Sequence, residues 1–476
     1  MSSGVSGLGG IFSRALDGLN VSQRGLTVTA NNIANVNTDG YARQNLIQGS
    51  RAIFGDGSSG GGVFASGVVS VVDPFIERQL SNEMADWGTL DGRRNTLQNI
   101  ETVVADRDGK GLGGAMNSFF TSWSDLSQNP QSGSLRSVVR EKGRVTTDLF
   151  KSLSKNLNNL RNSLSQTIDA RTDNINQLTR QVADLNRSIV NSGDDSTKAE
   201  LRNQRNLVVR NLSTEIGINY FEHSDGALVI QVQGSGFSLV DRFQSSTLNM
   251  IDTPSAGGTV QITGTLPGSG SGTLDLTSKI TAGRLAGNIL DRNEVINDQI
   301  ADLDELAYEF TTRMNAAHQN GYGLDSVTGR NFFAPVSGAS GAASTMALDN
   351  SVLTSLDAIA AAGQDPIVSG VGDSANARAM ISLQSALTME SGTKTFSQYF
   401  TAMGTSVGIL SAQVKGSFQG KQTLVDKLQI QRENISAVNL DEEASDLIRY
   451  QKAFEASTRV LSIANEMMDS VMELTR

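Results

Sequence analysis

The first helix that the sequence predicts is marked by apolar residues near the start of the chain. They recur at spacings of four and three residues, or the sum of the two, at Phe12, Leu16, Leu19, Leu26, Ala30 and Ile33. This spacing predicts an amphipathic helix with a narrow seam that packs against another helix.

Asparagine then fills the end of this predicted helix, at Asn31, Asn32, Asn35 and Asn37, before a turn at Thr38-Asp39-Gly40. Asn favours caps and turns, and Asp-Gly is a turn signal. The cluster can be read as a fraying helix end. The alternative is that these side chains form hydrogen bonds between packed subunits and fix their register, as a buried Asn does in coiled coils. Four Asn within seven residues favour the alternative.

The other end of the chain carries a matching pattern over residues 440–474. A heptad runs through Leu440, Ala444, Leu447, Gln451, Phe454, Thr458, Leu461, Asn465, Met468 and Met472. Several of these positions are polar or small, so the seam is weak for an isolated coiled coil and is expected to fold on meeting partners. A seam of this kind can also belong to an intramolecular core.

Helical periodicity fills most of the chain between these ends. Asp73 and Pro74 predict a helix start, because Asp caps helices and Pro fits the first helical position. Further helices are predicted over residues 116–126, 135–191, 200–212, 283–321, 375–387 and 396–418. Residues 135–191 and 200–212 are expected to pair as antiparallel helices.

Period-two patterning replaces the helical period between Gly217 and Ser278. Strands are predicted over residues 227–233, 258–263 and 273–276, with Gly and Pro between them. A further short strand is predicted over residues 63–72. The fold class is therefore mainly α with an inserted small all-β domain, in a chain that goes out and back. We expect a terminal helical domain of 1–60 and 435–476, a helical-bundle middle domain of 61–215 and 283–434, and a β domain of 216–282.

The composition narrows the class of function. The 476 residues carry a net charge of −10 with scattered Lys and Arg, so no basic face for nucleic acid is expected. No apolar run approaches the length of a membrane span, and no basic segment precedes the first apolar residues, which argues against a cleaved signal peptide. Cysteine is absent and only two histidines occur, so disulfides and thiolate metal sites are excluded and acid–base chemistry lacks its usual residue.

Two places suggest chemistry, and both have a simpler structural interpretation. His318 lacks a zinc motif around it and is more often a satisfied core or surface histidine than a catalyst. Residues 109–114, GKGLGG, lack the order of a phosphate-binding loop and follow a helix, so an ordinary loop is predicted. The acidic run Asp441-Glu442-Glu443 precedes a helix and suits its dipole. No active site, metal or cofactor is expected.

Several motifs resemble the bacterial flagellar axial proteins. TANNIANVNTDGYAR (Thr29 to Arg43) is similar to the signature that rod, hook and hook-associated proteins share near their N-termini. The resemblance narrows to the hook-associated proteins through four further stretches: YARQ from Tyr41, DPFIERQL from Asp73, NAAHQNG from Asn315 with NFF from Asn331, and VNLDEEA from Val438. Two departures are Val71 and Val72, where a basic residue is usual, and the short region 334–349, where some members carry a β insert.

This resemblance implies a structural, self-assembling protein at the junction between hook and filament. It implies that the terminal helices pair and stack around a central channel, and that the flagellar type III apparatus exports the chain to the extracellular flagellum without cleavage. The implied partners are other copies of the chain, the hook protein on one side, the next hook-associated protein on the filament side, and an export chaperone at the C-terminal helix. No nucleic acid and no membrane insertion are expected.

The expected assembly interface combines the seams with the Asn-rich turn. Its residues are Leu19, Leu26, Asn31, Asn32, Ile33, Asn35, Asn37, Gly40, Tyr41, Arg43, Leu440, Leu447, Phe454, Leu461 and Met468. Two alternatives stay open: another axial protein, of the hook or distal rod, and a secreted peptidoglycan hydrolase with axial-protein ends. The second would need a pair of catalytic acids in a cleft, and the predicted β segment offers none.

Overall fold

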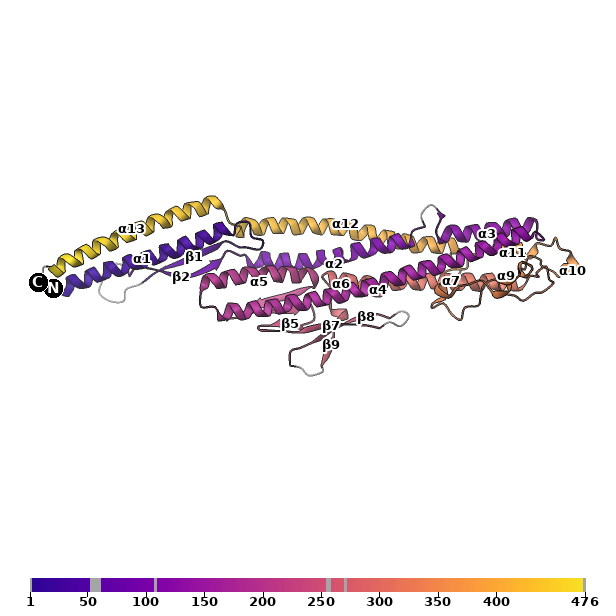
Figure 1. Ribbon diagram of the computed structural model, residues 1–476, viewed down its shortest axis with the longest axis horizontal. Coiled ribbons are helices and arrows are strands. Elements are labelled where there is room, and N and C mark those ends of the chain that lie inside the picture. Colours follow the sequence, from indigo (N-terminus) through magenta and orange to yellow (C-terminus); the bar gives the residue numbers. More distant parts are fainter. Residues whose placement is uncertain (1, 52–60, 107–108, 254–257, 269–271, 474–476) are drawn as a thin grey trace.

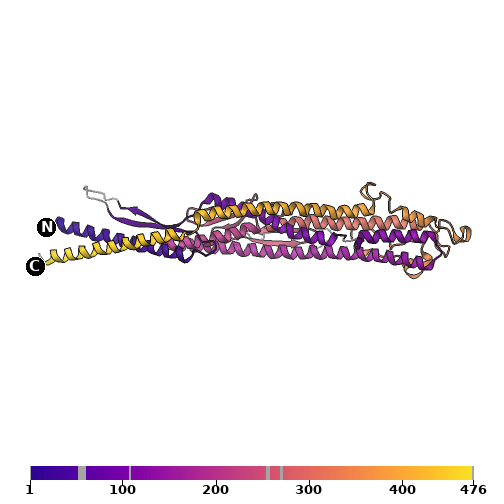
Figure 2. The same ribbon diagram turned by 90° about the horizontal axis from the view of Figure 1, so that it is seen from above.

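The computed structural model describes residues 2–51, 61–106, 109–253, 258–268 and 272–473, and it is strongly elongated (Figures 1 and 2). Both termini lie at the same end of the molecule, so the chain runs out and back as predicted. The expected fold class, mainly helical with a small β insert and paired terminal helices, is confirmed.

The narrow end of the molecule is a pair of antiparallel terminal helices. Helix α1 spans Ser2–Ala34 and α13 spans Leu440–Glu473, and the two pack along each other. The predicted Leu474 lies outside the described residues. An antiparallel pair of strands, β1 (Gln44–Ser50) and β2 (Val63–Ser70), follows α1 and packs against it. The pattern predicted β2 but not β1, and the two strands straddle the expected domain boundary at residue 60.

Long helices form the body of the molecule. They are α2 (Pro74–Val104), α3 (Leu112–Gln128), α4 (Gly133–Asn191), α5 (Asp195–Glu215), α6 (Arg284–Leu290), α7 (Ile296–Gln319) and α12 (Phe396–Ser436). The predicted helix start at Asp73 is confirmed, because its side chain accepts a hydrogen bond from the Phe75 N–H at 2.8 Å. A π-helical turn at Asp291–Val295 joins α6 to α7.

Helix α12 extends well beyond the predicted end at residue 418 and continues to Ser436. Its second half packs on α2 through a small separate cluster of Leu80, Val425 and Leu428. The sequence pattern missed this part because only one face of the extension is buried, and that face carries few large apolar residues.

An aromatic cluster forms the core at the far end of the body. Its rings lie 4.9–6.3 Å apart between centroids, and the cluster consists of Phe119, Phe120, Trp123, Phe150, Phe310, Phe332, Phe333 and Phe396. Short helices complete this end: α8 (Ala342–Thr345), α9 (Asn350–Thr354), α10 (Pro366–Ser369) and α11 (Ala375–Ser382). The predicted helix 375–387 therefore ends five residues early. Phe333 and Leu348 pair in an isolated bridge that closes the loop containing α8.

The β insert contains two antiparallel sheets. One is β3 (Ile218–Glu222), β4 (Leu228–Val232), β5 (Ser238–Asp241) and β6 (Gln244–Ser245); the other is β7 (Thr247–Asp252), β8 (Val260–Thr265) and β9 (Thr273–Asp275). The three predicted strands are confirmed as β4, β8 and β9. The sequence pattern did not identify the other four, β3, β5, β6 and β7.

Two buried asparagines of α4 hold the sheets to the helical body. Asn176 donates to the Leu248 carbonyl and accepts from the Leu248 N–H, each at 2.8 Å. Asn186 makes the same pair of bonds with Leu228, at 2.8 and 3.0 Å. Each amide therefore substitutes for a neighbouring strand, satisfying backbone groups that burial would otherwise leave unpaired.

Candidate assembly site

Small side chains line the face of α1 that contacts α13. Ala15, Ser22, Thr29 and Asn32 are buried there, at heptad spacing. Gly18 and Gly25 complete the row: a Cβ at Gly18 would lie 2.9 Å from the Ser457 hydroxyl, and one at Gly25 would lie 2.5 Å from the Tyr450 ring. The two helices approach closely because these positions carry little or no side chain.

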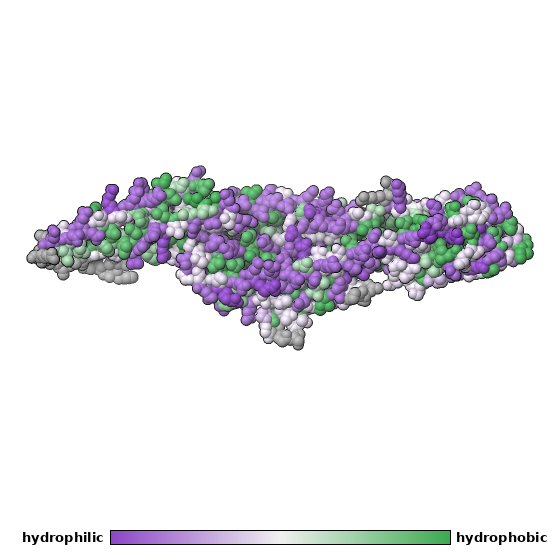
Figure 3. Space-filling model, in the orientation of Figure 1, coloured by the Kyte–Doolittle hydropathy of each residue, from purple (hydrophilic) through white to green (hydrophobic). Residues whose placement is uncertain are grey.

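The apolar seam predicted for α1 is therefore wrong, because the residues buried against α13 lie one position before the predicted ones. Phe12 is 38% exposed and Leu16 43% exposed, and Ala30 is exposed as well. Leu19, Leu26 and Ile33 are partly buried, beside the row of small residues. Apolar side chains thus remain on the surface of the terminal pair, where the space-filling view shows them among polar ones (Figure 3).

The seam of α13 is half as predicted. Leu447, Phe454, Leu461 and Met468 are partly buried. The intervening contacts come from residues one position before the predicted ones, namely Glu443, Tyr450, Ser457, Ala464 and Val471. Leu440 is 51% exposed, and Ile448, Ile463 and Met467 are 58%, 49% and 47% exposed.

Asn32 connects the terminal pair at its inner end. Its amide NH₂ donates to the Gln44 carbonyl at 2.9 Å and to the Glu443 carboxylate at 3.0 Å. Its amide oxygen accepts from the Tyr41 hydroxyl and from the Gln44 N–H, both at 2.9 Å. All four hydrogen-bonding positions of the amide are used within one chain. The prediction that this Asn bonds between subunits is therefore wrong for Asn32.

The other members of the Asn cluster are more exposed. Asn35 donates to the Asn31 carbonyl at 2.9 Å and accepts from the Thr38 hydroxyl at 3.1 Å, which closes the last turn of α1. Asn31 and Asn37 are exposed. For Asn35 the simple reading as a helix-end residue is the better one.

Arg43 and Tyr41 complete the connection to α13. The Arg43 guanidinium forms an ion pair with Glu443 at 2.8 Å and a second one with Glu442. Tyr41 is partly buried, and burial, followed by the charges of Glu200 and Glu443, raises the pKa of its hydroxyl, so it stays a donor. We call Asn32, Tyr41, Arg43, Gln44 and Glu443 the polar clamp.

The clamp also contacts the body. The Arg43 N–H donates to the Ser436 carbonyl at the end of α12, and the Arg43 carbonyl accepts from the Val71 N–H, both at 2.8 Å. Gly40 has φ +79° and packs on α5, where a Cβ would lie 3.2 Å from the Leu207 side chain. The predicted Gly40 turn is confirmed, since both the backbone conformation and the space require glycine.

Sequence analysis missed two members of the clamp. Gln44 and Glu443 were noted only as members of the YARQ and VNLDEEA motifs, and Glu443 also as part of an acidic helix start; neither was assigned to the interface. The charges of Arg43 and of the acidic run 441–443 could have suggested that the two segments pair. Because Arg43 and Glu442 are 399 positions apart in the sequence, no local pattern connects them.

The two places with apparent chemistry are structural. His318 is fully buried; its Nδ1–H donates to the Arg330 carbonyl at 2.7 Å and its Nε2 accepts from the Ala360 N–H at 2.9 Å. Burial lowers the pKa of His318 to about 4. In the loop near residue 110, Asp106 accepts from the Gly111 and Gly114 N–H groups, so a carboxylate of the chain already occupies these donors.

Within the described residues, no group of three or more His, Cys, Asp or Glu side chains could hold a metal ion. Among the helices of the described residues, none is long and apolar enough to cross a membrane.

Comparisons with known proteins agree with this architecture. The model of the flagellar hook-associated protein FlgK helical domain matches residues 97–333. Models of a flagella basal body rod protein and of the flagellar basal body rod FlgEFG protein C-terminal region match residues 14–41 and 431–474. The matched ends are the two helices that pair, so the chain has the organisation of a flagellar axial protein.

Relatives over nearly the whole chain carry one name. Flagellar hook-associated protein 1 of Bacillus subtilis is 27% identical over 95% of this chain and 96% of the relative, and that of Salmonella typhimurium is 26% identical over 98% and 99%. The solved flagellar hook junction protein FlgK from Burkholderia pseudomallei shares the fold, with a TM-score of 0.67 and 16% identity over 75% of this chain and 100% of that chain. The chain belongs to the flagellar hook-associated protein 1 family. It is a structural component of the bacterial flagellum and not an enzyme.

Proposed function

We propose that copies of this chain assemble as a short layer between hook and filament. In this layer the paired helices α1 and α13 line the inner wall and the body forms the outer wall. The neighbours are the hook protein on one side and the next hook-associated protein on the other. The names of the relatives support this position in the flagellum.

The observation that carries the proposal is the unpartnered apolar surface of the terminal pair. Small residues of α1 form much of its contact with α13, and large apolar side chains remain exposed on both helices, including Phe12, Leu16, Ile448, Ile463 and Met467. Apolar surface of this kind marks an interaction site. It lies along two paired helices, so helices of neighbouring copies could pack on it. The predicted interface residues Leu440 and Asn31, both exposed, extend this surface.

The same surface suits export before assembly. A terminal pair held by a narrow contact separates at low cost, so the chain can pass through the flagellar type III apparatus without cleavage and order on arrival. A chaperone that covers the C-terminal helix would shield Ile448, Ile463 and Met467 beforehand. The protein then functions in the extracellular part of the flagellum.

Deletion of the gene tests the proposal. Cells lacking the chain should build hooks without filaments and release filament protein into the medium, as seen by electron microscopy and immunoblotting. Filaments of normal number on the deletion strain would refute a role at the junction. Hooks that fail to form would instead indicate a rod or hook component.

A further inference from the structure

The π-helical turn at Asp291–Val295 interrupts the helix that α6 and α7 would otherwise form together. The Ile296 N–H donates to the Asp291 carbonyl, five residues before it, where an α-helix uses the residue four before. The turn therefore contains one more residue than an α-helical turn. Turns of this kind are rare and are found mostly at functional sites, so this one is a candidate for a conformational device.

The helices on both sides of the π turn are fixed by close packing. A Cβ at Gly287 of α6 would overlap the Thr89 carbonyl oxygen, and one at Gly92 of α2 would lie 2.8 Å from the Arg284 carbonyl oxygen. Helix α7 begins with Ile296, which is fully buried. Because α6 and α7 are both held, a rearrangement of the backbone between them is confined to the π turn.

Two residues of the π turn hold the second β sheet. Asn293 accepts from the Val260 N–H at 2.8 Å and donates to the Val260 carbonyl at 2.9 Å, at the start of β8. Arg292, which is buried, donates to the Asp252 carboxylate at the end of β7, at 2.9 Å. The other end of β7 is held separately by Asn176 of α4. Unwinding of the turn would therefore release the sheet only at the end near Val260.

Asp291 points from the same turn into the body. Its carboxyl group is fully buried, and its Oδ1 accepts from the Nε–H of Arg93 of α2 at 2.8 Å. Its Oδ2 is buried without a hydrogen-bond partner among the described residues. An ionised carboxylate is thus only half satisfied here, which costs free energy that a bound proton removes. Burial accordingly raises the pKa of Asp291 to about 7, although the charge of Arg93 lowers it.

Other charged groups near the π turn have partners or face solvent. Arg284 of α6 and Arg171 of α4 both pair with Glu215, at 3.1 and 2.8 Å. Glu294 of the turn is exposed, and its charge raises the pKa of Asp291 further. Asp298 of α7 is exposed as well. Arg93 is therefore the cation that acts directly on Asp291.

We propose that the π turn is a latch that holds the start of β8 on the body and opens when Asp291 loses its proton. In the closed state Asp291 lies inside and Asn293 holds Val260. In the open state the turn forms α-helical hydrogen bonds, the Asp291 carboxylate reaches water, and the Val260 N–H loses its acceptor. The docking of the second sheet thereby depends on the pH of the surroundings.

The direction and size of the effect follow from the two states of Asp291. The closed state binds the proton more tightly, so closing is favoured as the pH falls and opening as it rises. The pKa of the carboxyl is about 7 when closed and has its ordinary value of about 4 when open. The equilibrium constant for opening should therefore rise about tenfold between pH 6 and pH 8.

Hydrogen exchange of the full chain at pH 6 and pH 8 tests the proposal. Single amides are resolved by mass spectrometry with electron-transfer fragmentation, and each rate is divided by the intrinsic rate at that pH. The protection of the Val260 amide should fall about tenfold from pH 6 to pH 8.

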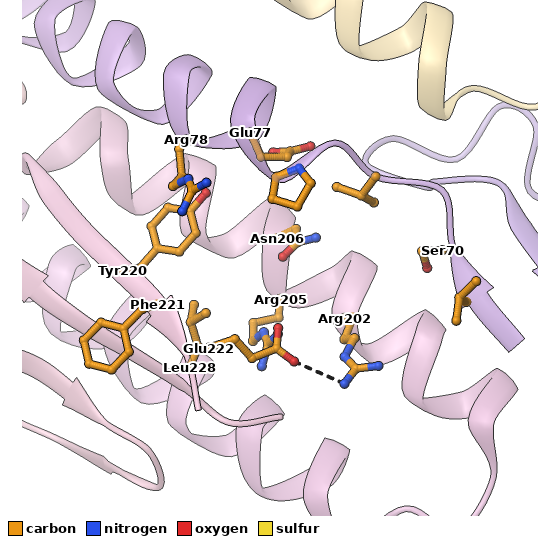
Figure 4. Close-up of a pocket in the computed structure, with 13 residues that line it drawn as sticks. Ser70, Glu77, Arg78, Arg202, Arg205, Asn206, Tyr220, Phe221, Glu222 and Leu228 are labelled. Carbon is orange, nitrogen blue, oxygen red and sulfur yellow. Dashed lines mark hydrogen bonds and ion pairs between the residues drawn. The ribbon is translucent and has the colours of Figure 1, made fainter. Parts of the chain in front are cut away.

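The first sheet supplies the matched control. The Leu228 N–H of β4 donates to Asn186 of α4 at 3.0 Å, an asparagine contact like that of Val260 but away from the π turn. Glu222 of β3 also ties this sheet to the body, through an ion pair with Arg202 of α5 at 3.1 Å (Figure 4). The corrected protection of the Leu228 amide should be the same at both pH values.

Two variants assign the effect to Asp291. Asp291→Asn imitates the protonated carboxyl and cannot ionise, so the Val260 amide should keep at pH 8 the protection that the wild type has at pH 6. Glu294→Gln removes the exposed acid of the same turn and should keep the tenfold change.

Three results would each overturn the proposal. One is wild-type protection of Val260 that does not change with pH. Another is an equal loss at Leu228, which would show that the opening is not confined to the latch. The third is a tenfold change that persists in Asp291→Asn, which would assign the titration to another group. The wild-type comparison of the two amides needs no variant, so a failure of Asp291→Asn to fold would leave the proposal open to refutation.

Discussion

Protonation of His318 should destabilise the body of the molecule as the pH falls. The buried imidazole is neutral, with one nitrogen donating and the other accepting a backbone hydrogen bond. Burial lowers the pKa of His318 from 6.5 to about 4; the hydrogen bond to the Arg330 carbonyl and the charge of Asp349 raise this pKa, while the charges of Arg330 and Arg136 lower it. Since the pKa is lower in the folded chain, the stabilisation is complete above pH 6.5 and is lost as the pH falls toward 4.

The size of this effect follows from the two pKa values. One unit corresponds to about 1.4 kcal/mol, so the full loss is about 3 kcal/mol, of which about 2 kcal/mol is reached by pH 5. Asp291 acts in the opposite direction, because burial raises the pKa of its carboxyl to about 7 and the folded state then favours the protonated form at low pH. The contribution of His318 is therefore measured by comparing the pH dependence of the unfolding free energy between variants. All of these variants keep Asp291, so its effect on that pH dependence cancels in the comparison.

Urea unfolding at pH 7.5 and pH 5 measures this difference. Trp123, whose ring centroid lies 6.2 Å from that of His318, reports on the site by fluorescence. His318→Gln keeps a donor and an acceptor but does not titrate, so between the two pH values it should lose about 2 kcal/mol less stability than the wild type. His223→Gln removes the other histidine, whose side chain is 46% exposed, and serves as the matched control. Equal pH dependence in all three proteins would refute the argument from the neutral buried imidazole.

Two further predictions concern the terminal pair. Asn32→Ala leaves the Gln44 backbone groups without their partners and should cost about 2–5 kcal/mol of clamp stability, so fewer hooks should bear filaments although the protein is still exported. Asn35→Ala, at a local helix end, should have a small effect. Equal filament counts for the two variants would contradict a special role of Asn32. Gly25→Ala places a methyl group against the Tyr450 ring and should also reduce the number of hooks that bear filaments. Gly9→Ala, whose Cβ meets nothing within 4 Å, should leave that number unchanged. If Gly25→Ala assembles as well as Gly9→Ala, close packing of α1 on α13 is not required.

The helical framework was predictable because its signals are local. Asp73 and Pro74 mark the start of α2 through the backbone beside them, and the alternation around Leu228 marks a strand without reference to any partner. The end of α12 carried no such signal, because its apolar contacts are confined to one thin row against α2.

The assembly site was predictable only in outline. Apolar periodicity selects Leu and Phe over Gly and Ser, so it identified the exposed stripe of α1 and missed the row around Gly18 and Gly25 that makes the contact. The partners of Asn32 include a residue 411 positions away, and no pattern within the sequence connects the two. The Asn cluster was correctly singled out as unusual, but which of its members is buried depends on the packing of α13.

The bridge between Phe333 and Leu348 closes a loop in this chain that could lengthen at small cost. The Ala334 N–H donates to the Ala347 carbonyl at 2.8 Å, so the chain leaves the core and returns to it at neighbouring points. An extra domain placed between them would need no rearrangement of the aromatic core. The alignment with the Salmonella typhimurium relative spans 555 positions, against 476 residues here, so the relative carries additional residues within a shared framework. Additions at this loop would thicken the outside of the flagellum while the terminal helices, and the bore they are proposed to line, stay the same.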